Sequence, residues 1–346
     1  MDDENMTATQ SSSEVDGDEY FDSYFDLNVH DVMLKDTTRT LAYKNAIEQN
    51  QIDFKNKIVM DVGAGTGILS MFAAKCGAAR VYAIEASPMA IYTERLVEAN
   101  GLSDIITVIN KRVENLDDDD FVDDIKKVDI IISEWMGFYL LHESMLESVL
   151  DARDRWLAPN GIIFPTTGNI MIAPVNLNKL MHDRVHHWDN VYGFDFSLFK
   201  DLSIHTLHSK PLIEYLDADS VLAPGRSLIE IDFRTVKKEE LRDINIASMP
   251  FDISDDGCTV IHGFAIWFNC YFVGSQATVR LDTAPGSPYT HWKQTTILLP
   301  QEIDIKGFNH IDICLRMKQD DINPRFYELS LSFPDDDDDQ SNTNNE

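Results

Sequence analysis

The chain contains Lys57-Ile58-Val59-Met60-Asp61-Val62-Gly63-Ala64-Gly65-Thr66-Gly67, in which a short apolar run passes directly into a glycine-rich turn. The residues up to Gly63 predict a buried β-strand, and residues 68–76 predict the helix that follows the turn. Glycines at such a turn let the backbone bend tightly and approach a ligand closely. The stretch therefore predicts the first strand, turn and helix of an α/β domain that holds a ligand at this turn.

Further strand and helix patterns lie on both sides of this unit. Residues 37–50 carry the apolar spacing of an amphipathic helix. Strand patterns follow at 79–84, 105–109, 128–132 and 161–165, and helical patterns cover 87–100 and a segment that ends at Leu157. Strands that alternate with helices predict a parallel, doubly wound, Rossmann-like sheet.

The pattern changes after Pro165. Short β-branched runs separated by turn residues then dominate, at 229–233, 263–273, 295–299, 311–317 and 327–333. They predict an antiparallel β domain, a sandwich or a barrel. We place the first domain at 20–165 and the second at 166–333, and we expect disordered acidic tails at 1–19 and 334–346.

The charge balance is strongly acidic. Of 346 residues, 29 are Lys or Arg and 59 are Asp or Glu, which gives a formal net charge of -30. This charge disfavours direct binding to nucleic acid or an anionic membrane and favours basic proteins as partners. The alternative is that the acidic surface only keeps the protein soluble. The four cysteines form no CxxC pair, so we expect neither a disulfide framework nor a zinc site. Because no apolar leader pattern opens the sequence, we expect the protein in the nucleus or the cytoplasm.

Acidic residues follow three of the predicted strands. Asp61 stands just before the first glycine, Glu85 closes the strand at 79–84, and Glu114 follows the strand at 105–109. Asp61 would repel a pyrophosphate but attract the ammonium and sulfonium end of S-adenosyl-L-methionine, while Glu85 suits ribose hydroxyls and Glu114 an adenine amine. Arg39 is the nearest cation for the carboxylate of that molecule. The pattern favours S-adenosyl-L-methionine over NAD as the cofactor.

A second motif places two glutamates on one loop. The strand at 128–132 leads into Ser133-Glu134-Trp135-Met136-Gly137-Phe138-Tyr139-Leu140-Leu141-His142-Glu143-Ser144-Met145. Ligands bind at the carboxyl ends of strands in such sheets. Two carboxylates in one pocket suit the planar, forked donors of a guanidinium. The simpler alternative is that Glu134 is an ordinary loop residue and Glu143 a surface charge.

Together, four segments resemble the protein arginine N-methyltransferases: Asp61–Gly67, Glu85, Ser133–Met145 and Tyr289-Thr290-His291-Trp292-Lys293-Gln294. The resemblance covers Tyr20 to Phe333. It implies methyl transfer from S-adenosyl-L-methionine to guanidino nitrogens of protein arginines, with S-adenosyl-L-homocysteine as the product and no metal. It also implies a β-barrel as the second domain.

The resemblance assigns roles to individual residues. The residues expected to bind the cofactor are His30, Arg39, Asp61, Gly63, Gly65, Glu85 and Glu114, with Tyr20 and Tyr24 on a lid that covers it. Glu134 and Glu143 would grip the guanidinium, and Glu143, or His291 beside Asp36, would accept the proton. Met33 and Met145 imply the type I, asymmetric product, unless they only fill the core.

Assembly and substrates follow from the same resemblance. It implies a homodimer, in which residues 176–200 form a helical arm that packs on the partner's cofactor domain, and a cis peptide bond at Pro165. Histone tails and Arg/Gly-rich RNA-binding proteins are the implied substrates. Ala64 and residues 263–268 are similar to the nuclear, histone-directed subgroup, protein arginine N-methyltransferase 6, and His142 stands where an aromatic residue is common in the most abundant member. The alternatives are a small-molecule methyltransferase that uses the same cofactor and an inactive homologue that serves as a scaffold.

Overall fold

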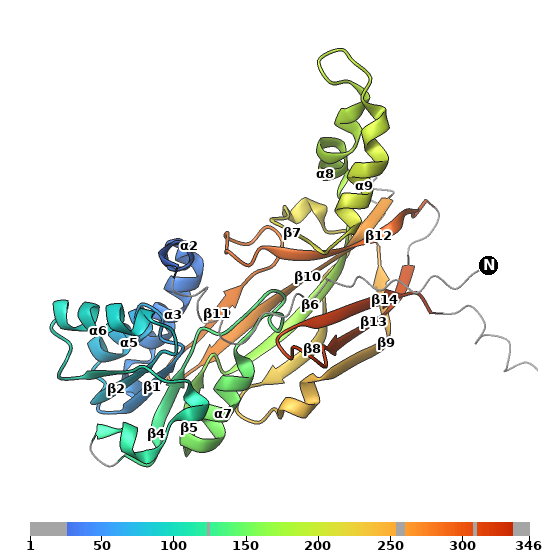
Figure 1. Ribbon diagram of the computed structural model, residues 1–346. Coiled ribbons are helices and arrows are strands. Elements are labelled where there is room, and N and C mark those ends of the chain that lie inside the picture. The colour runs from blue at the N-terminus through green and yellow to red at the C-terminus, as the bar shows by residue number, and fades with distance from the viewer. Residues whose placement is uncertain (1–25, 123–124, 254–259, 307–309, 335–346) are drawn as a thin grey trace, which may run out of the picture.

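The structure is a computed structural model that describes residues 26–122, 125–253, 260–306 and 310–334. A parallel sheet with its helices occupies the N-terminal half, and antiparallel strands follow it (Figure 1). Two helices project from the antiparallel part and form the arm. This order confirms the predicted fold class, a doubly wound sheet followed by an antiparallel β-barrel domain.

The parallel sheet has five strands in the order β3-β2-β1-β4-β5. Their bounds are β1 Ile58–Val62, β2 Arg80–Ile84, β3 Ile106–Ile109, β4 Val128–Ile132 and β5 Leu157–Phe164. Strands β1 and β4 are neighbours at the centre, and their apolar side chains are almost entirely buried. Because the strands are parallel, the carboxyl ends of β1, β2 and β4 meet at one edge of the sheet.

Six α-helices lie in the described residues of this half of the chain. They are α2 Leu27–Lys35, α3 Thr37–Gln49, α4 Gln51–Phe54, α5 Ile68–Lys75, α6 Met89–Ala99 and α7 Leu146–Trp156. Asp36 separates α2 from α3 and caps α3, because its Oδ1 accepts a hydrogen bond from the N–H of Arg39 at 2.9 Å. The helices predicted at 37–50, 68–76 and 87–100 are confirmed within two residues.

The β domain contains two antiparallel sheets. The larger has the order β7-β12-β10-β6-β8 with β11 paired to β10, and the smaller has the order β14-β13-β9. The bounds are β6 Thr167–Val175, β7 Leu212–Glu214, β8 Arg226–Asp232, β9 Asp243–Asp252, β10 Val260–Val273, β11 Thr278–Asp282, β12 Gln294–Asp304, β13 His310–Gln319 and β14 Tyr327–Ser332. The sequence pattern missed β6, although β6 lies in the middle of its sheet. Gly168, Asn169 and Pro174 explain the failure, since these residue types are depleted in central strands.

Aromatic side chains join the two halves into one continuous core. Tyr43 of α3 meets Phe272 of β10 edge to face, with ring centroids 4.7 Å apart, and Phe164 also meets Phe272, at 5.8 Å. The Phe164–Pro165 peptide bond is cis, as predicted. The side-chain oxygen of Asn50 accepts hydrogen bonds from the N–H groups of Gln276 and Ala277. These contacts fix the β domain against α3, which carries predicted site residues.

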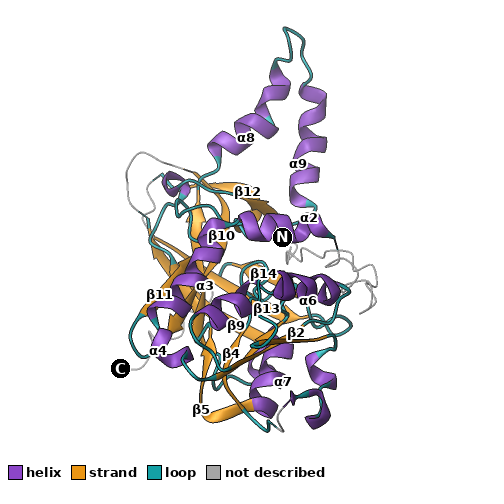
Figure 2. Cartoon of the chain, turned by 90° about the vertical axis from the view of Figure 1, so that its left-hand side faces the viewer, coloured by secondary structure: helices purple, strands orange, loops and turns teal. Residues whose placement is uncertain are grey.

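The arm is longer than predicted and is not continuously helical. Its two helices are α8 Asn178–Arg184 and α9 Lys200–His208, so the arm extends eight residues beyond the predicted end at Lys200. The chain turns back at the tip between α8 and α9 (Figure 2), and Tyr192 and Gly193 in that connection have positive φ angles. Glycine suits such a turn, and the helical prediction did not take account of it. Among the described residues, no helix is both long and apolar enough to cross a membrane.

Candidate active site

A pocket lies at the carboxyl ends of β1, β2 and β4, where helices α2 and α3 also contribute side chains. The predicted site residues that line it are His30, Met33, Arg39, Gly63, Gly65, Glu85, Glu114, Glu134, Met145 and His291. Asp36, Asp61 and Glu143 are not part of the lining. Tyr20 and Tyr24 lie outside the described residues. The fold therefore brings together segments that are distant in sequence, including His291 from the β domain.

The glycine-rich turn forms one wall of the pocket. Gly63 and Gly65 have φ angles of 70° and 53°, a region that glycine adopts without steric cost. A Cβ atom at Gly63 would lie 2.3 Å from Cε of Met145, so a side chain there would displace that methionine. The N–H groups of Gly63 and Ala64 both donate to the carbonyl of Ile84 at 2.9 Å. The turn is thus tied to the end of β2 and presents bare backbone to the pocket.

Glu85 holds this turn from the end of β2. Its Oε2 accepts a hydrogen bond from the N–H of Gly65 at 2.7 Å, and its Oε1 accepts one from the N–H of Ser87 at 2.8 Å. Each carboxylate oxygen keeps a second lone pair, so the same group can accept ribose hydroxyls. Glu114 lies on a short 3-10 helix, η1 Val113–Asn115, and also lines the pocket.

Asp61 occupies a different place from the predicted one. Its side chain is fully buried, and its Oδ2 accepts hydrogen bonds from the N–H and the hydroxyl of Ser70, at 3.0 and 2.7 Å. Burial raises the pKa of Asp61 to about 7. Asp61 therefore ties β1 to α5 behind the glycine-rich turn, and this position contradicts the expected contact with the amino end of the cofactor.

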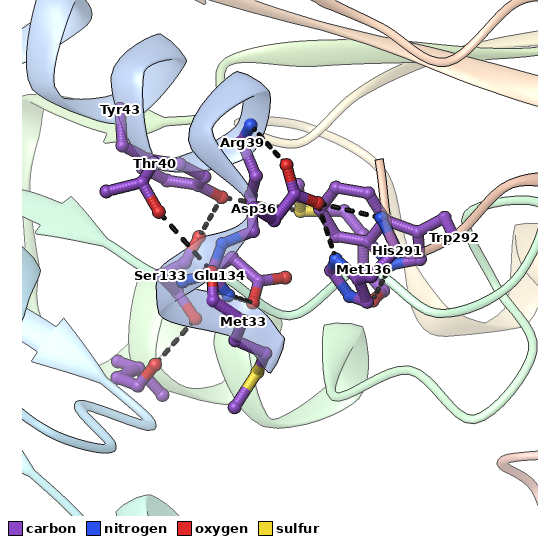
Figure 3. A network of polar contacts seen from close by, with 11 residues as sticks. Met33, Asp36, Arg39, Thr40, Tyr43, Ser133, Glu134, Met136, His291 and Trp292 are labelled. Carbon is purple, nitrogen blue, oxygen red and sulfur yellow. Dashed lines mark hydrogen bonds and ion pairs between the residues drawn. The ribbon is translucent and has the colours of Figure 1, made fainter. Parts of the chain in front are cut away.

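Glu134 and Arg39 form a buried ion pair inside the pocket. Nη1 of Arg39 lies 2.6 Å from Oε2 of Glu134, and both side chains are almost buried (Figure 3). Helix α3 supplies the arginine, and the loop after β4 supplies the glutamate. Burial of either charge alone would be costly, so each stabilises the other. Arg39 was predicted to meet a cofactor carboxylate; in the structure it pairs with the first glutamate of the two-glutamate loop.

His291 lies beside Asp36, as the resemblance implies. Nδ1 and the backbone N–H of His291 are each 2.8 Å from Oδ2 of Asp36 (Figure 3). Burial opposes ionisation of Asp36, but hydrogen bonds from His291 and from the N–H of Arg39 outweigh it and hold the pKa of Asp36 below its ordinary value. The next residue, Trp292, donates from Nε1 to the carbonyl of Met136 at 2.9 Å. The β domain thus contacts both α3 and the two-glutamate loop.

Glu143 does not meet Glu134 in the described pocket. Its side chain is exposed, its φ angle is 59°, and its N–H donates to the carbonyl of Arg325 at 2.6 Å. Although it is exposed, desolvation by the surrounding chain raises the pKa of its carboxyl group above the ordinary value. The two glutamates of the motif therefore have different surroundings. Of the two residues predicted to grip the guanidinium, Glu134 lines the pocket and Glu143 does not.

Tyr43 is a site residue that sequence reasoning missed. Its hydroxyl donates to the carbonyl of Ser133 at 2.8 Å, and the hydroxyl of Ser133 donates to the carbonyl of Val62 at 2.6 Å. Burial raises the pKa of Tyr43 well above its ordinary value, so the hydroxyl stays protonated and remains a donor. The signal in the sequence was an aromatic residue on the buried face of the helix at 37–50. These bonds connect α3, β4 and β1 directly behind Glu134.

No group of three or more His, Cys, Asp or Glu side chains within the described ranges is arranged to hold a metal ion. Met33 and Met145, the residues predicted to influence product type, both line the pocket. They lie on α2 and just before α7, respectively.

Two family models match adjacent parts of the chain. Residues 37–163 match the model described as ribosomal protein L11 methyltransferase, and residues 166–338 match the model described as arginine methyltransferase oligomerization subdomain. The two matches meet at the cis proline, which separates the parallel sheet from the antiparallel strands.

Curated relatives match along most of the chain. Protein arginine N-methyltransferase 1 of Schizosaccharomyces pombe is 40% identical over 316 residues, which cover 91% of this chain and 89% of the relative. A probable protein arginine N-methyltransferase 6.1 of Oryza sativa subsp. indica is 38% identical over 337 residues, which cover 90% of this chain and 86% of the relative. Because both subgroups are similar to this extent, the subgroup stays a prediction.

A solved structure supports the same relationship. The PRMT1 enzyme-prozyme heterotetrameric complex of Trypanosoma brucei, described as holding AdoHcy, superposes with a TM-score of 0.77 at 36% identity. The match covers 91% of this chain and 96% of that chain.

Proposed function

The chain belongs to the protein arginine N-methyltransferases, and we propose that it transfers methyl groups from S-adenosyl-L-methionine to guanidino nitrogens of arginines in basic proteins. The observation that carries this proposal is the buried Glu134 carboxylate, which shares one pocket with the glycine-rich turn and Glu85. A carboxylate in that place suits a cationic acceptor. The net charge of -30 also favours basic substrates such as histone tails and Arg/Gly-rich proteins.

The pocket residues fit the cofactor. Gly63 and Gly65 present backbone without a side chain to the pocket, and a Cβ atom at either position would crowd Met145 or His30. A cofactor can therefore approach the backbone closely there. Glu85 would accept from the ribose, Glu114 would lie near the adenine, and Arg39 would meet the carboxylate. When bound, S-adenosyl-L-methionine supplies a methyl group already activated by its sulfonium, and S-adenosyl-L-homocysteine is the product.

The protein's own part in catalysis is to orient and activate the acceptor. A guanidinium has a pKa above 12, so its nitrogen lone pairs are delocalised and weakly nucleophilic. The Glu134 carboxylate would draw positive charge to one nitrogen and free another for attack. Glu143, with its raised pKa, or His291 held by Asp36 would accept the proton that is lost.

We propose that the dimethylated product is asymmetric, the type I outcome. Met33 and Met145 both border the pocket that holds Glu134. An unbranched thioether leaves more space beside the acceptor than the bulkier phenylalanine of enzymes with a symmetric product. The test is mass spectrometry of an Arg/Gly-rich peptide incubated with the protein and S-adenosyl-L-methionine. Asymmetric dimethylarginine supports both proposals, monomethylarginine alone contradicts the type, and unmodified peptide despite measured cofactor binding contradicts the activity.

We propose that the protein forms a homodimer through its arm. Apolar side chains near the arm tip are strongly exposed, with Leu198 at 88% and Leu202 at 62%. Helix α6 of the cofactor domain also exposes Ile91 and Tyr92, so it offers an apolar face for a partner's arm. Exposed apolar groups of this kind indicate an interaction surface.

The double substitution Leu198→Asp with Leu202→Asp should give monomers with poor activity, because charges cannot be buried in an apolar interface. Sedimentation velocity measures the assembly, and Ile52→Asp, on the exposed side of α4, is the matched control. An active monomer would refute the link between assembly and activity.

A further inference from the structure

The two-glutamate loop has an unusual backbone between Gly137 and Glu143. Tyr139, Leu140 and Glu143 have φ angles of 40°, 80° and 59°, and residues other than glycine rarely adopt this region. The loop is also tightly folded, because a Cβ atom at Gly137 would lie 1.6 Å from the carbonyl oxygen of His142. Such a conformation persists only where surrounding structure holds it.

The turn between β13 and β14 supplies that support. The N–H of Glu143 donates to the carbonyl of Arg325, and the N–H of Tyr327 lies 3.4 Å from Nδ1 of His142. The His142 ring also meets the ring of Phe326 edge to face, with centroids 5.0 Å apart. The loop and the turn therefore contact each other on both sides of the bond between His142 and Glu143.

Several hydrogen bonds within the turn define its shape. Oδ1 of Asp320 accepts from the N–H groups of Ile322 and Asn323, at 2.8 and 2.7 Å. The N–H of Asp320 in turn donates to the carbonyl of Phe326 at 2.9 Å, and the N–H of Phe326 donates to the carbonyl of Asn323 at 2.9 Å. These internal bonds hold Phe326 in place against the His142 ring.

His142 is suited to an acceptor role in this contact. Its side chain is buried, with 7% of its surface exposed. Burial lowers the pKa of His142 to about 4, so the ring is neutral near pH 7. A neutral imidazole has one acceptor nitrogen, and Nδ1 faces the N–H of Tyr327.

We infer that His142 is a positioning residue, which couples the β13–β14 turn to the two-glutamate loop and thereby sets the direction of the Glu143 carboxylate. The inference rests on the proposed function, in which Glu143 is one of the two groups that would accept the proton from the guanidinium. It goes beyond that function because it places the control of the second glutamate in the β domain.

The test compares His142→Ala with His142→Asn in the full chain. The alanine removes both the acceptor and the ring contact, so we expect kcat to fall about tenfold or more while the Kd of S-adenosyl-L-methionine stays within about twofold. The asparagine keeps an acceptor near the position of Nδ1 and should restore kcat to within about threefold of wild type. Ile322→Ala, an exposed side chain on the same turn, is the control and should match wild type. Melting temperatures measured for all four proteins identify variants that fail to fold.

Each outcome decides the matter. A fall in kcat with intact cofactor affinity and rescue by asparagine supports the inference. Unchanged kcat in His142→Ala overturns it and leaves the proposed function standing. Equal losses of kcat and cofactor affinity, or an asparagine variant as inactive as the alanine variant, overturn the positioning role. If wild type binds the cofactor but methylates no arginine peptide, both the inference and the proposed function fail.

Discussion

The cofactor side of the pocket is held mainly by contacts between neighbouring strand ends, whereas the substrate side is held by contacts that cross the whole chain. On the cofactor side, Glu85 bonds Gly65 across 20 positions of sequence. On the substrate side, Glu134 pairs with Arg39 across 95 positions, and Asp36 with His291 across 255. The Glu85–Gly65 bond lies within the parallel sheet and its turn, whereas the Asp36–His291 contact also needs the β domain docked against α3. We therefore expect substitutions on the cofactor side to change cofactor affinity and substitutions on the substrate side to change turnover.

The largest expected effect is on the substrate side. Glu134→Gln keeps the shape of the side chain but removes the charge that would orient a guanidinium, so kcat should fall by about 100-fold or more. The affinity for S-adenosyl-L-methionine should stay nearly intact. Radiometric methyl transfer and calorimetry measure the two quantities, with Glu48→Gln on the exposed face of α3 as the control. Turnover that survives the substitution would show that Glu134 does not activate the guanidinium as proposed.

A substitution on the cofactor side should affect cofactor affinity instead of turnover. Glu85→Gln loses a charge-assisted acceptor, a kind of bond worth about 1.5–3 kcal/mol, so the Kd of S-adenosyl-L-methionine should rise about tenfold or more. At saturating cofactor, kcat should change little. An equal loss of kcat would mean that the two sides are not separable.

A change between the domains should have an intermediate effect. Asp36→Asn weakens the hold on His291 and should lower kcat about tenfold, a change of about 1.4 kcal/mol in the activation barrier. Asp31→Asn is the matched control, because Asp31 is exposed on α2 and pairs with Lys35. Wild-type turnover in Asp36→Asn would show that the contact between Asp36 and His291 does not contribute to catalysis.

The smallest expected effect concerns stability and its pH dependence. The pKa of Asp61 is raised from 3.8 to about 7 in the folded protein, so the folded state binds this proton more tightly than the unfolded state. The stability from this group is therefore present below pH 3.8 and is lost as pH rises through 7. Relative to Asp61→Asn, the wild-type melting temperature should fall by a few degrees between pH 5 and pH 8. If the melting temperatures of the two proteins changed equally between pH 5 and pH 8, the raised pKa of Asp61 would be contradicted.

Local patterns predicted the cofactor side well. Apolar runs and glycines mark β1, its turn and α5, and Glu85 and Glu114 follow their strands as expected, because strand ends in a parallel sheet meet at one edge. Asp61 shows the limit of this reasoning. Sequence spacing places it at the right strand end, but the pleat decides which face a side chain takes, and this carboxylate points to Ser70 behind the turn.

The substrate side shows what sequence alone determined and what it left to the tertiary structure. The amino-acid sequence determined which residues are available: two glutamates that follow a strand and a histidine in a loop of the β domain. Only the folded chain decided that Glu134 meets Arg39, that His291 meets Asp36, and that Glu143 is held by the β13–β14 turn. The physical reason is that sequence periodicity reports local backbone geometry. Contacts across a domain junction depend instead on how aromatic side chains such as Tyr43, Phe164 and Phe272 pack there.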